Sequence, residues 1–357
     1  MVHILTAADV CEIVALSGFT DELVRESRSL FYRLCDEDQR GRIQCPERSK
    51  ITTDRWTLLT MPGHDGRLAT TTVKLVTVPA PNMSDTTSPQ RQGVPASTVV
   101  LDPQTGAIQA LVNARHLTAL RTAAGSLVAT QLLWKTPVKE RRREPTTLAL
   151  FGAGLQIEYH ARLFLDEYPS IETCYVVNRT ATRAHELVSR LQGGADVTTK
   201  ATTSRAIRFE CIDQSSDHLA QADILVCATS STVPLLADKA IRSGAHLVLV
   251  GSYTPHMHEV STQTIHRASA VVVDSAEHAL REAGELIDAQ PHPVLELGQL
   301  LLEDGTPNDS NLQRASQGEL TIFKSVGLAV QDVLVTHLVC EAAQRRSIGT
   351  IVSDFDG

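Results

Sequence analysis

The sequence predicts an α/β protein with a doubly wound parallel sheet and an additional α+β domain built from both chain ends. From residue 135 to 315, short apolar runs alternate with helix-like stretches, as in β-α-β units. The flanks, residues 1–134 and 316–357, instead hold long helical patterns and β-branched runs. With 357 residues, 42% of them hydrophobic, the chain is large enough for two packed cores.

Six apolar runs in the middle region are predicted strands, because each is short and bounded by polar, glycine or proline residues. They are residues 147–151, 173–177, 207–212, 223–228, 246–250 and 270–273. Helices are predicted over 155–167 and 181–191, and a loop over 192–204. This alternation of strands and helices is typical of a Rossmann-like domain.

The flanking regions predict a different arrangement. A helix is expected over 21–35, strands over 55–61, 69–78 and 97–101, and a proline-containing loop over 81–95. Asp102 to Gly106 has turn chemistry, so 107–113 is expected to return as a hairpin strand. Long helices are predicted over 117–134 and 324–345, and we expect the second to fold back onto the N-terminal domain.

Composition argues against several kinds of partner. The 33 Lys and Arg residues are outnumbered by 41 Asp and Glu, and a net charge of -8 gives no cationic field for nucleic acid or an anionic membrane. The basic run 139–143 lies between Pro137 and Pro145 and is predicted to be a solvated connection. Nucleic acid and membrane are therefore not expected partners.

The N-terminal residues show no basic region leading into an apolar one, and no stretch reaches the roughly 20 apolar residues of a membrane span. Seven cysteines without a C-x-x-C pair suit free thiols in a reducing compartment, so a cytoplasmic location is predicted. His256 and His258 lack a third ligand at a recognisable spacing, and no metal site is predicted.

A glycine-rich turn lies directly between the first predicted strand and helix of the middle region. Glycines there let a pyrophosphate approach backbone N–H groups at the positive end of a helix. The third glycine of the usual pattern is replaced by Ile157, and the alternative is an ordinary glycine turn. The strand-turn-helix context favours dinucleotide binding by Gly152, Ala153, Gly154, Leu155 and Gln156.

The second strand ends in Asn178, Arg179 and Thr180, where NAD-binding domains usually place an acidic residue for the adenosine ribose. A guanidinium attracts the 2′-phosphate of NADP(H), whereas a carboxylate repels it. Arg179, aided by Arg183 and Thr180, therefore predicts NADPH/NADP+ rather than NADH, and the alternative is that Arg179 merely caps an exposed turn.

Three cations lie outside the middle region: Arg48 after Pro46, Lys74 inside a predicted strand and Arg121 on the helix predicted over 117–134. Burying such charges without a partner is costly, and a substrate carboxylate would supply one. The alternative for each is pairing within the chain or extension of the charged end to solvent.

The chain resembles the ornithine cyclodeaminase/mu-crystallin family over nearly its whole length. The stretches that carry the resemblance are HLTALRTAAG at 116–125, GAGLQ at 152–156, ADILVCATS at 222–230 and FKSVGLAVQD at 323–332. Weaker similarities are Met61-Pro62, Lys74-Leu75-Val76 with Pro81-Asn82, and Glu282-Ala283-Gly284-Glu285. The resemblance implies a homodimer formed through the domain assembled from both chain ends.

The resemblance also implies residue roles. Arg48 and Arg121 would hold a substrate carboxylate, and Lys74 would lie beside the reacting carbon and nitrogen. Thr122, with Arg121, would approach the cofactor phosphates, and residues 152–156 would hold the pyrophosphate. Residues 178–180 would bind the 2′-phosphate, as in the NADPH-using mu-crystallin branch. Thr229, Ser230 and Ser252 would lie near the nicotinamide half.

One position departs from the members that cyclise ornithine, which carry an aspartate two residues after the glycine that ends the fifth strand. Here Gly251 is followed two residues later by Tyr253. A neutral phenol is a poor counter-ion for the second ammonium group of ornithine, although Tyr253 is able to orient an imine or donate a proton.

The sequence therefore predicts an NADP(H)-dependent oxidoreductase that reduces the C=N bond of a small ketimine or cyclic imino acid. An ornithine cyclodeaminase-type lyase and an amino-acid dehydrogenase are the enzymatic alternatives. A mu-crystallin-type protein that binds NADPH and a small acid without turnover is the non-enzymatic one.

Overall fold

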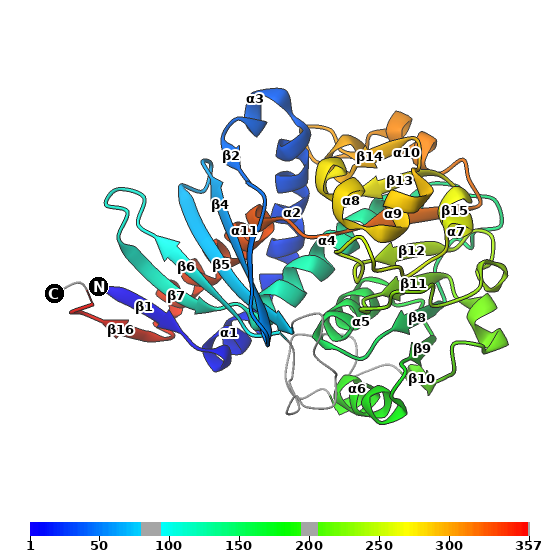
Figure 1. The fold of residues 1–357 in the computed structure, drawn as a ribbon, viewed down its shortest axis with the longest axis horizontal. Helices are drawn as coiled ribbons and strands as arrows, with labels where there is room; N and C mark the ends of the chain where they lie inside the picture. Colours follow the sequence, from blue (N-terminus) through cyan, green and yellow to red (C-terminus); the bar gives the residue numbers. More distant parts are fainter. Residues whose placement is uncertain (80–93, 194–205, 356–357) are drawn as a thin grey trace.

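The computed structural model describes residues 1–79, 94–193 and 206–355, which form two eight-stranded sheets with helices packed on them (Figure 1). The loops predicted at 81–95 and 192–204 fall almost entirely outside these ranges, as do Pro81 and Asn82. Among the described residues, no helix has the length and apolar character needed to cross a membrane.

The middle region forms a parallel sheet with strand order β10-β9-β8-β11-β12-β15-β13-β14. Its strands are β8 (Thr147–Phe151), β9 (Thr173–Val177), β10 (Arg208–Cys211), β11 (Ile224–Cys227), β12 (His246–Leu249), β13 (Ala268–Val273), β14 (Val294–Glu296) and β15 (Leu320–Lys324). Its helices are α5 (Leu155–Glu167), α6 (Ala181–Gly193), α7 (Thr262–His266), α8 (Ala276–Glu282), α9 (Gly284–Ala289) and α10 (Asp309–Ala315), with 3-10 turns η2 (Asp217–Gln221), η3 (Asp238–Ala240) and η4 (Leu297–Leu300). The order reverses at β8, whose neighbours are β9 and β11, and such a switch point is where doubly wound sheets bind ligands.

The six predicted strands are confirmed, but the sheet has two more. β15 lies between β12 and β13, so the parallel sheet extends past the boundary expected at residue 315. The helix predicted from residue 324 begins instead at Ala329. Gly327 adopts φ +83 between them, a conformation that ends the strand and precludes a continuous helix.

The two chain ends form the other sheet, as the predicted fold class requires. Its order is β16-β1-β7-β6-β5-β4-β2, with β3 paired to β4, and only the β1–β7 pair among its described pairings is parallel. Its strands are β1 (Val2–Leu5), β2 (Ile43–Gln44), β3 (Ser49–Thr52), β4 (Trp56–Asp65), β5 (Thr70–Pro79), β6 (Ala96–Leu101), β7 (Ile108–Asn113) and β16 (Thr350–Val352). Its helices are α1 (Ala7–Val14), α2 (Phe19–Cys35), α3 (Glu37–Arg40), α4 (Arg115–Lys135) and α11 (Ala329–Arg346).

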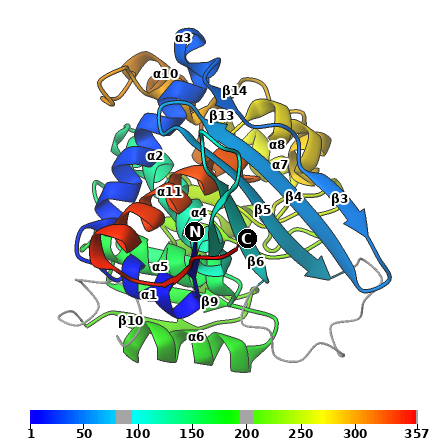
Figure 2. The same cartoon turned by 90° about the vertical axis from the view of Figure 1, so that its left-hand side faces the viewer.

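Helices α4 and α11 join the two halves of the molecule. α11 packs against β4, β5 and β6, which confirms that the last helix folds back onto the N-terminal part (Figure 2). α4 contacts α2 and α11 on one side and α5, β12 and β15 on the other. A helix that is buried all round needs small and apolar residues on every face, and α4 is buried from Leu117 to Trp134 except at Thr118 and Gln131.

Candidate active site

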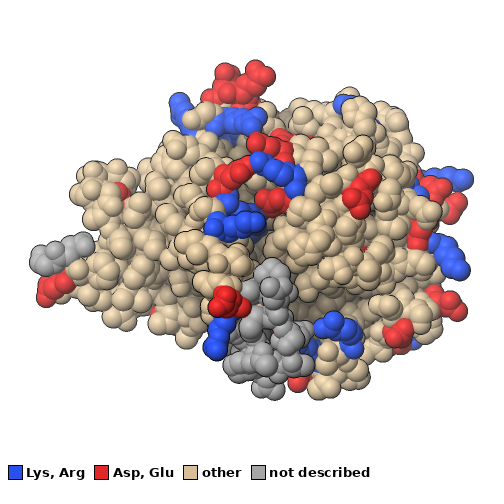
Figure 3. Space-filling view, in the orientation of Figure 1, with Lys and Arg blue, Asp and Glu red and all other residues tan. Residues whose placement is uncertain are grey.

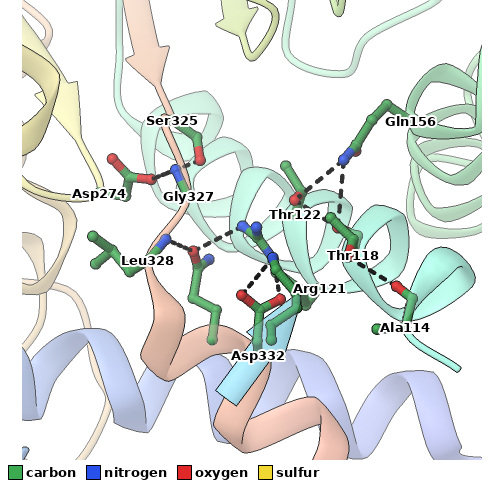
Figure 4. Close-up of polar contacts among 12 residues, drawn as sticks. Ala114, Thr118, Arg121, Thr122, Gln156, Asp274, Ser325, Gly327, Leu328 and Asp332 are labelled. Atoms are coloured by element: carbon green, nitrogen blue, oxygen red, sulfur yellow. Dashed lines mark hydrogen bonds and ion pairs between the residues drawn. The ribbon is translucent and has the colours of Figure 1, made fainter. Parts of the chain in front are cut away.

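Lys74 and Arg121 meet at one carboxylate, Asp332, in the first turn of α11 (Figure 4). The Lys74 Nζ lies 2.6 Å from Asp332 Oδ2, and the Arg121 Nε lies 3.2 Å from Asp332 Oδ1. All three side chains are at most 6% exposed. Lys74 faces inward because alternate residues of β5 point to opposite faces, and this face packs against α11. Three distant parts of the chain therefore build one charged centre.

The guanidinium of Arg121 is oriented by its other contacts. Its Nη1 donates to Gln331 Oε1 at 3.0 Å, and the backbone N–H of Leu328 donates to the same oxygen at 2.9 Å. A Cβ added to Gly327 would lie 2.7 Å from both Nη1 and Nη2 of Arg121. Glycine at 327 thus lets the loop backbone lie close against the guanidinium, where any side chain would clash.

Arg48 reaches the same loop from the N-terminal half. Its Nη2 donates to the carbonyls of Val326 and Gly327, each at 3.1 Å, and lies 2.9 Å from Glu282 Oε2 at the end of α8. A neighbouring ion pair joins Arg281 to Glu47. On the face shown in Figure 3, acidic and basic side chains gather between the two halves of the molecule.

The three predicted cations therefore come together, but a substrate carboxylate, which was expected as the partner of their buried charges, is not required. Asp332, Gln331 and Glu282 pair with them, so a substrate carboxylate is not needed to stabilise them. The alternative of pairing within the chain is the one observed. These partners were not predicted from the sequence, although Gln331, Asp332 and Glu282 lie inside the stretches that carry the family resemblance.

Asp274 holds the loop that both arginines contact. Its Oδ2 accepts from Ser325 Oγ at 2.7 Å, Val326 N at 3.0 Å and Gly327 N at 2.7 Å. Asp274 directly follows β13, and the loop directly follows β15. One buried carboxylate thus fixes the loop to the carboxyl edge of the parallel sheet.

Burial shifts the pKa values of the two acid-base candidates. Desolvation lowers the pKa of Lys74 to about 8, with Asp332 opposing the shift and Arg121 and Arg48 adding to it. Burial raises the pKa of Tyr253, and Arg48 opposes that shift. Lys74 is thus a cation that can lose its proton just above neutral pH, while the Tyr253 phenol stays neutral there.

The glycine turn after β8 is shaped for a phosphate group. Gly152 has φ +116, and a Cβ there would lie 3.0 Å from the Ala228 carbonyl oxygen, so a side chain would clash. Gly154 is the N-cap of α5, and among the described residues no atom lies within 4 Å of a Cβ built on it. The first N–H groups of α5 therefore face accessible space, as anion binding requires.

Two side chains connect this turn with the charged centre. The Gln156 Nε2 donates to the Thr118 carbonyl at 3.4 Å and weakly to Thr122 Oγ1 at 3.5 Å. Thr122 follows Arg121 on α4, so the predicted phosphate and carboxylate contacts arise from adjacent residues. Ala153 and Leu155, also predicted contacts, are half-buried in the turn.

The residues predicted to bind the 2′-phosphate lie just after β9. Asn178 is half-buried and its Nδ2 donates to the Thr180 carbonyl at 2.9 Å, which shapes the turn. Arg179, Thr180 and Arg183 are exposed. The glycines at the pyrophosphate position fit a pyridine dinucleotide, and two exposed arginines lie beyond β9.

On the other side of the switch point, Glu259 organises the residues that follow β11 and β12. It accepts hydrogen bonds from Thr229 N, Thr229 Oγ1 and Gly251 N at 2.7, 3.0 and 2.7 Å. Ser230 is exposed. The Ser252 hydroxyl is fully buried, donates to the Met257 carbonyl at 2.7 Å and accepts from Gly284 N at 3.2 Å, so it links its loop to the start of α9.

Sequence comparison decides the family. The family profile described as "Ornithine cyclodeaminase/mu-crystallin family" matches residues 18–347. The chain belongs to the ornithine cyclodeaminase/mu-crystallin family. The resemblance on which the residue roles depend is thereby confirmed.

Members of the ornithine cyclodeaminase/mu-crystallin family similar to this chain include two reductases. "Ketimine reductase mu-crystallin" of Mus musculus is 30% identical over 292 residues, covering 82% of each chain. A "Delta(1)-pyrroline-2-carboxylate reductase" of Bacillus cereus is 31% identical over 296 residues, covering 82% of this chain and 83% of the relative.

Solved structures show the same fold across the family. The Delta(1)-pyrroline-2-carboxylate reductase of Thermococcus litoralis, in complex with NADH and L-proline, has a TM-score of 0.77 at 25% identity and covers 98% of this chain and 100% of its own. A lysine cyclodeaminase has a TM-score of 0.78 at 25% identity and covers 99% of this chain and 95% of its own.

Proposed function

We propose that the protein reduces the C=N bond of a small ketimine or cyclic imino acid that carries a carboxylate, with NADPH as the reductant. The observation that carries this proposal is the convergence of Lys74, Arg121 and Arg48 beside the glycine turn, linked through Thr122 and Gln156. The reductase names of the mouse and Bacillus cereus relatives support it. So does the Thermococcus litoralis complex, whose ligands are NADH and the cyclic amino acid L-proline.

When bound, the cofactor supplies the hydride, and this chain's residues position the substrate and its proton. Arg121 would bind the carboxylate through its guanidinium, and Arg48, which donates to the Gly327 carbonyl, adds a second positive charge. Lys74, held by Asp332, keeps a proton on a buried amine near the position of the imine nitrogen. Fixing both ends of a small substrate in this way orients the C=N carbon.

The preference for NADPH over NADH rests on Arg179. Arg179→Ala should weaken NADPH binding about tenfold or more, because charge-assisted hydrogen bonds contribute roughly 1.5–3 kcal/mol, and should leave NADH binding nearly unchanged. Fluorescence titration with both cofactors measures this. Equal weakening of both, or an unmodified protein that prefers NADH, would refute the preference.

The reaction is tested with a panel of linear and cyclic imino acids, assayed by loss of NADPH absorbance. We expect steady turnover with a cyclic imino acid and slow or no conversion of ornithine to proline, because Tyr253 gives the second ammonium group no anionic partner. Tyr253→Asp should improve ornithine binding. Ammonia release from ornithine with only catalytic cofactor would favour a cyclodeaminase, and binding without turnover of any substrate would favour a non-enzymatic role.

We also propose a homodimer in the cytoplasm. The family resemblance supports the dimer, and the free cysteines among the described residues suit a reducing compartment.

A further inference from the structure

Two carboxylates and one lysine are fully buried behind the carboxyl ends of β11, β12 and β15. Glu259, Glu285 and Lys324 are each 0% exposed, and the Lys324 Nζ lies 2.9 Å from Glu285 Oε1. Lys324 and Glu285 both lie near enough to Glu259 to change its pKa. We call these three residues the Glu259 cluster. The proposed substrate contacts do not use them, yet burying so much charge is costly.

The Glu259 cluster contains one more acidic than basic group. Glu259 accepts three hydrogen bonds, from Thr229 N and Oγ1 on one oxygen and from Gly251 N on the other. A carboxylate that only accepts on both oxygens is in its ionised form, whereas a protonated one would need to donate. The pKa of Glu259 is raised, chiefly by burial and also by Glu285, while Lys324 and the backbone N–H groups of Thr229 and Gly251 oppose the shift. With Glu285 paired to Lys324, the cluster carries a net negative charge.

The position of the cluster matches one half of the proposed dinucleotide site. The glycine turn after β8 and Arg179 after β9 are assigned to the pyrophosphate and the adenosine. A dinucleotide that crosses the switch point must then place its nicotinamide half over β11 and β12. Thr229 and Gly251, which directly bond to Glu259, are the residues just beyond those strands.

We propose that the Glu259 cluster favours the oxidised form of the bound dinucleotide and so makes the bound reduced form a stronger hydride donor. This inference rests on the proposed function. The nicotinamide ring carries one positive charge in NADP+ and none in NADPH, since the hydride takes two electrons and a proton to the imine carbon. A buried negative charge attracts the charged ring with little screening by solvent. Tighter binding of the oxidised form necessarily makes hydride donation more favourable.

The test measures the Kd values of NADP+ and NADPH by isothermal titration calorimetry. Glu259→Gln keeps the shape of the side chain and removes its charge. We expect the ratio of Kd for NADP+ to Kd for NADPH to rise roughly tenfold, because a buried unit charge acts at an effective dielectric constant of about 20, well below that of water. Weaker NADP+ binding should account for most of the change.

A second variant separates charge from positioning. Glu285→Gln also removes one negative charge but leaves the bonds of Glu259 to Thr229 and Gly251 in place, so it should raise the same ratio. The control is Asp65→Asn, which removes a buried carboxylate paired with Arg33 at 2.7 Å in the other sheet and should leave the ratio unchanged.

The outcomes distinguish this inference from the proposed function. Glu259→Gln and Glu285→Gln proteins that bind both nucleotides with an unchanged ratio would overturn the inference alone. An unmodified protein that binds neither NADP+ nor NADPH would overturn the proposed function and the inference with it. A ratio that rises in both glutamate variants and not in Asp65→Asn would support a charge effect on the nicotinamide.

Discussion

Lys74 keeps a charge inside the protein because Asp332 lies 2.6 Å from its Nζ. Desolvation nevertheless lowers the pKa of Lys74 to about 8, and the guanidinium groups of Arg121 and Arg48 add to this effect. A lysine is charged below its pKa and neutral above it. The positive charge of Lys74 is thus present at neutral pH and is lost as the pH rises through about 8.

The pH profile of kcat/KM tests this role. We expect kcat/KM for imine reduction to fall above about pH 8, because free enzyme with neutral Lys74 lacks the proton and the charge that bind the substrate. Lys74→Gln should lower kcat/KM by roughly 100-fold or more and abolish this alkaline limb. If kcat/KM of Lys74→Gln falls at the same alkaline pH as that of the unmodified protein, the group that titrates is the substrate imine and not Lys74.

At the scale of single residues, the sequence identified the cations and missed their anions. A lysine between apolar residues of a strand is unusual, so Lys74 could be identified as a candidate from the neighbouring sequence alone. Asp332 and Glu282 are polar residues in helices, where a solvated face is the usual explanation, and their roles depend on which helix packs where. The buried hydrogen bonds of Ser252 were not predictable for a similar reason, because they follow from the packing of a loop against α9.

The turn between β15 and α11 is the element that connects the proposed substrate contacts with the parallel sheet. Backbone carbonyls of the turn accept hydrogen bonds from Arg48, and Gly327 lies against Arg121. The Asp274 carboxylate accepts hydrogen bonds from the Ser325 hydroxyl and from the backbone N–H of Gly327. Disturbing this turn should therefore move both arginines together, while the glycine turn after β8 stays in place.

Asp274→Asn tests the turn. The amide is a weaker acceptor than the carboxylate, so we expect KM for the imino acid to rise about tenfold and stability to fall by about 1.5–3 kcal/mol. The Kd of NADPH should change little. Steady-state kinetics, denaturant unfolding and cofactor titration measure the three quantities. Ser325→Ala, which removes one donor and leaves the carboxylate, is the matched control and should have a smaller effect, and a larger effect there would contradict the assigned role of Asp274.

At the scale of elements, strands with strong local patterns were predictable, whereas two strands of the parallel sheet, β14 and β15, and four short strands of the terminal sheet, β1, β2, β3 and β16, were not. The six predicted strands of the parallel sheet are short apolar runs with clear boundaries. β15 runs directly into residues that share the character of α11, and only its pairing with β12 and β13 identifies it as a strand. The basic run 139–143 was expected to be solvated, but Arg141 donates to three backbone carbonyls and Thr321 Oγ1 and lies over Trp134.

At the scale of the whole molecule, the outer face of the terminal sheet carries partly exposed apolar side chains among uncharged polar ones. Strand alternation and register place one set of side chains on the face opposite Lys74 and α11. They include Ile51, Leu58, Val73, Leu75, Val99 and Leu111. Figure 3 shows few charged side chains over this part of the surface. An apolar face of this kind favours pairing of two copies.

Leu75→Lys tests the proposed homodimer. Leu75 is 37% exposed, so the substitution should leave the fold intact and place a charge in the interface. We expect a dimer for the unmodified protein and a monomer for Leu75→Lys at micromolar concentration, by light scattering. Val233→Lys, at a position 64% exposed on the other half of the molecule, is the control and should remain dimeric. A monomeric unmodified protein would refute the assignment.

The pairing of the chain ends has a consequence for how the protein folds during synthesis. β1 is hydrogen-bonded to β16, and β15 fills the position between β12 and β13. β16 is an edge strand, but β15 is internal, so the parallel sheet cannot be completed until residues 320–324 have left the ribosome. Such long-range contacts slow folding. We expect nascent chains that end before β15 to expose unpaired edges of β12 and β13 and to depend on chaperones until β15 has been added.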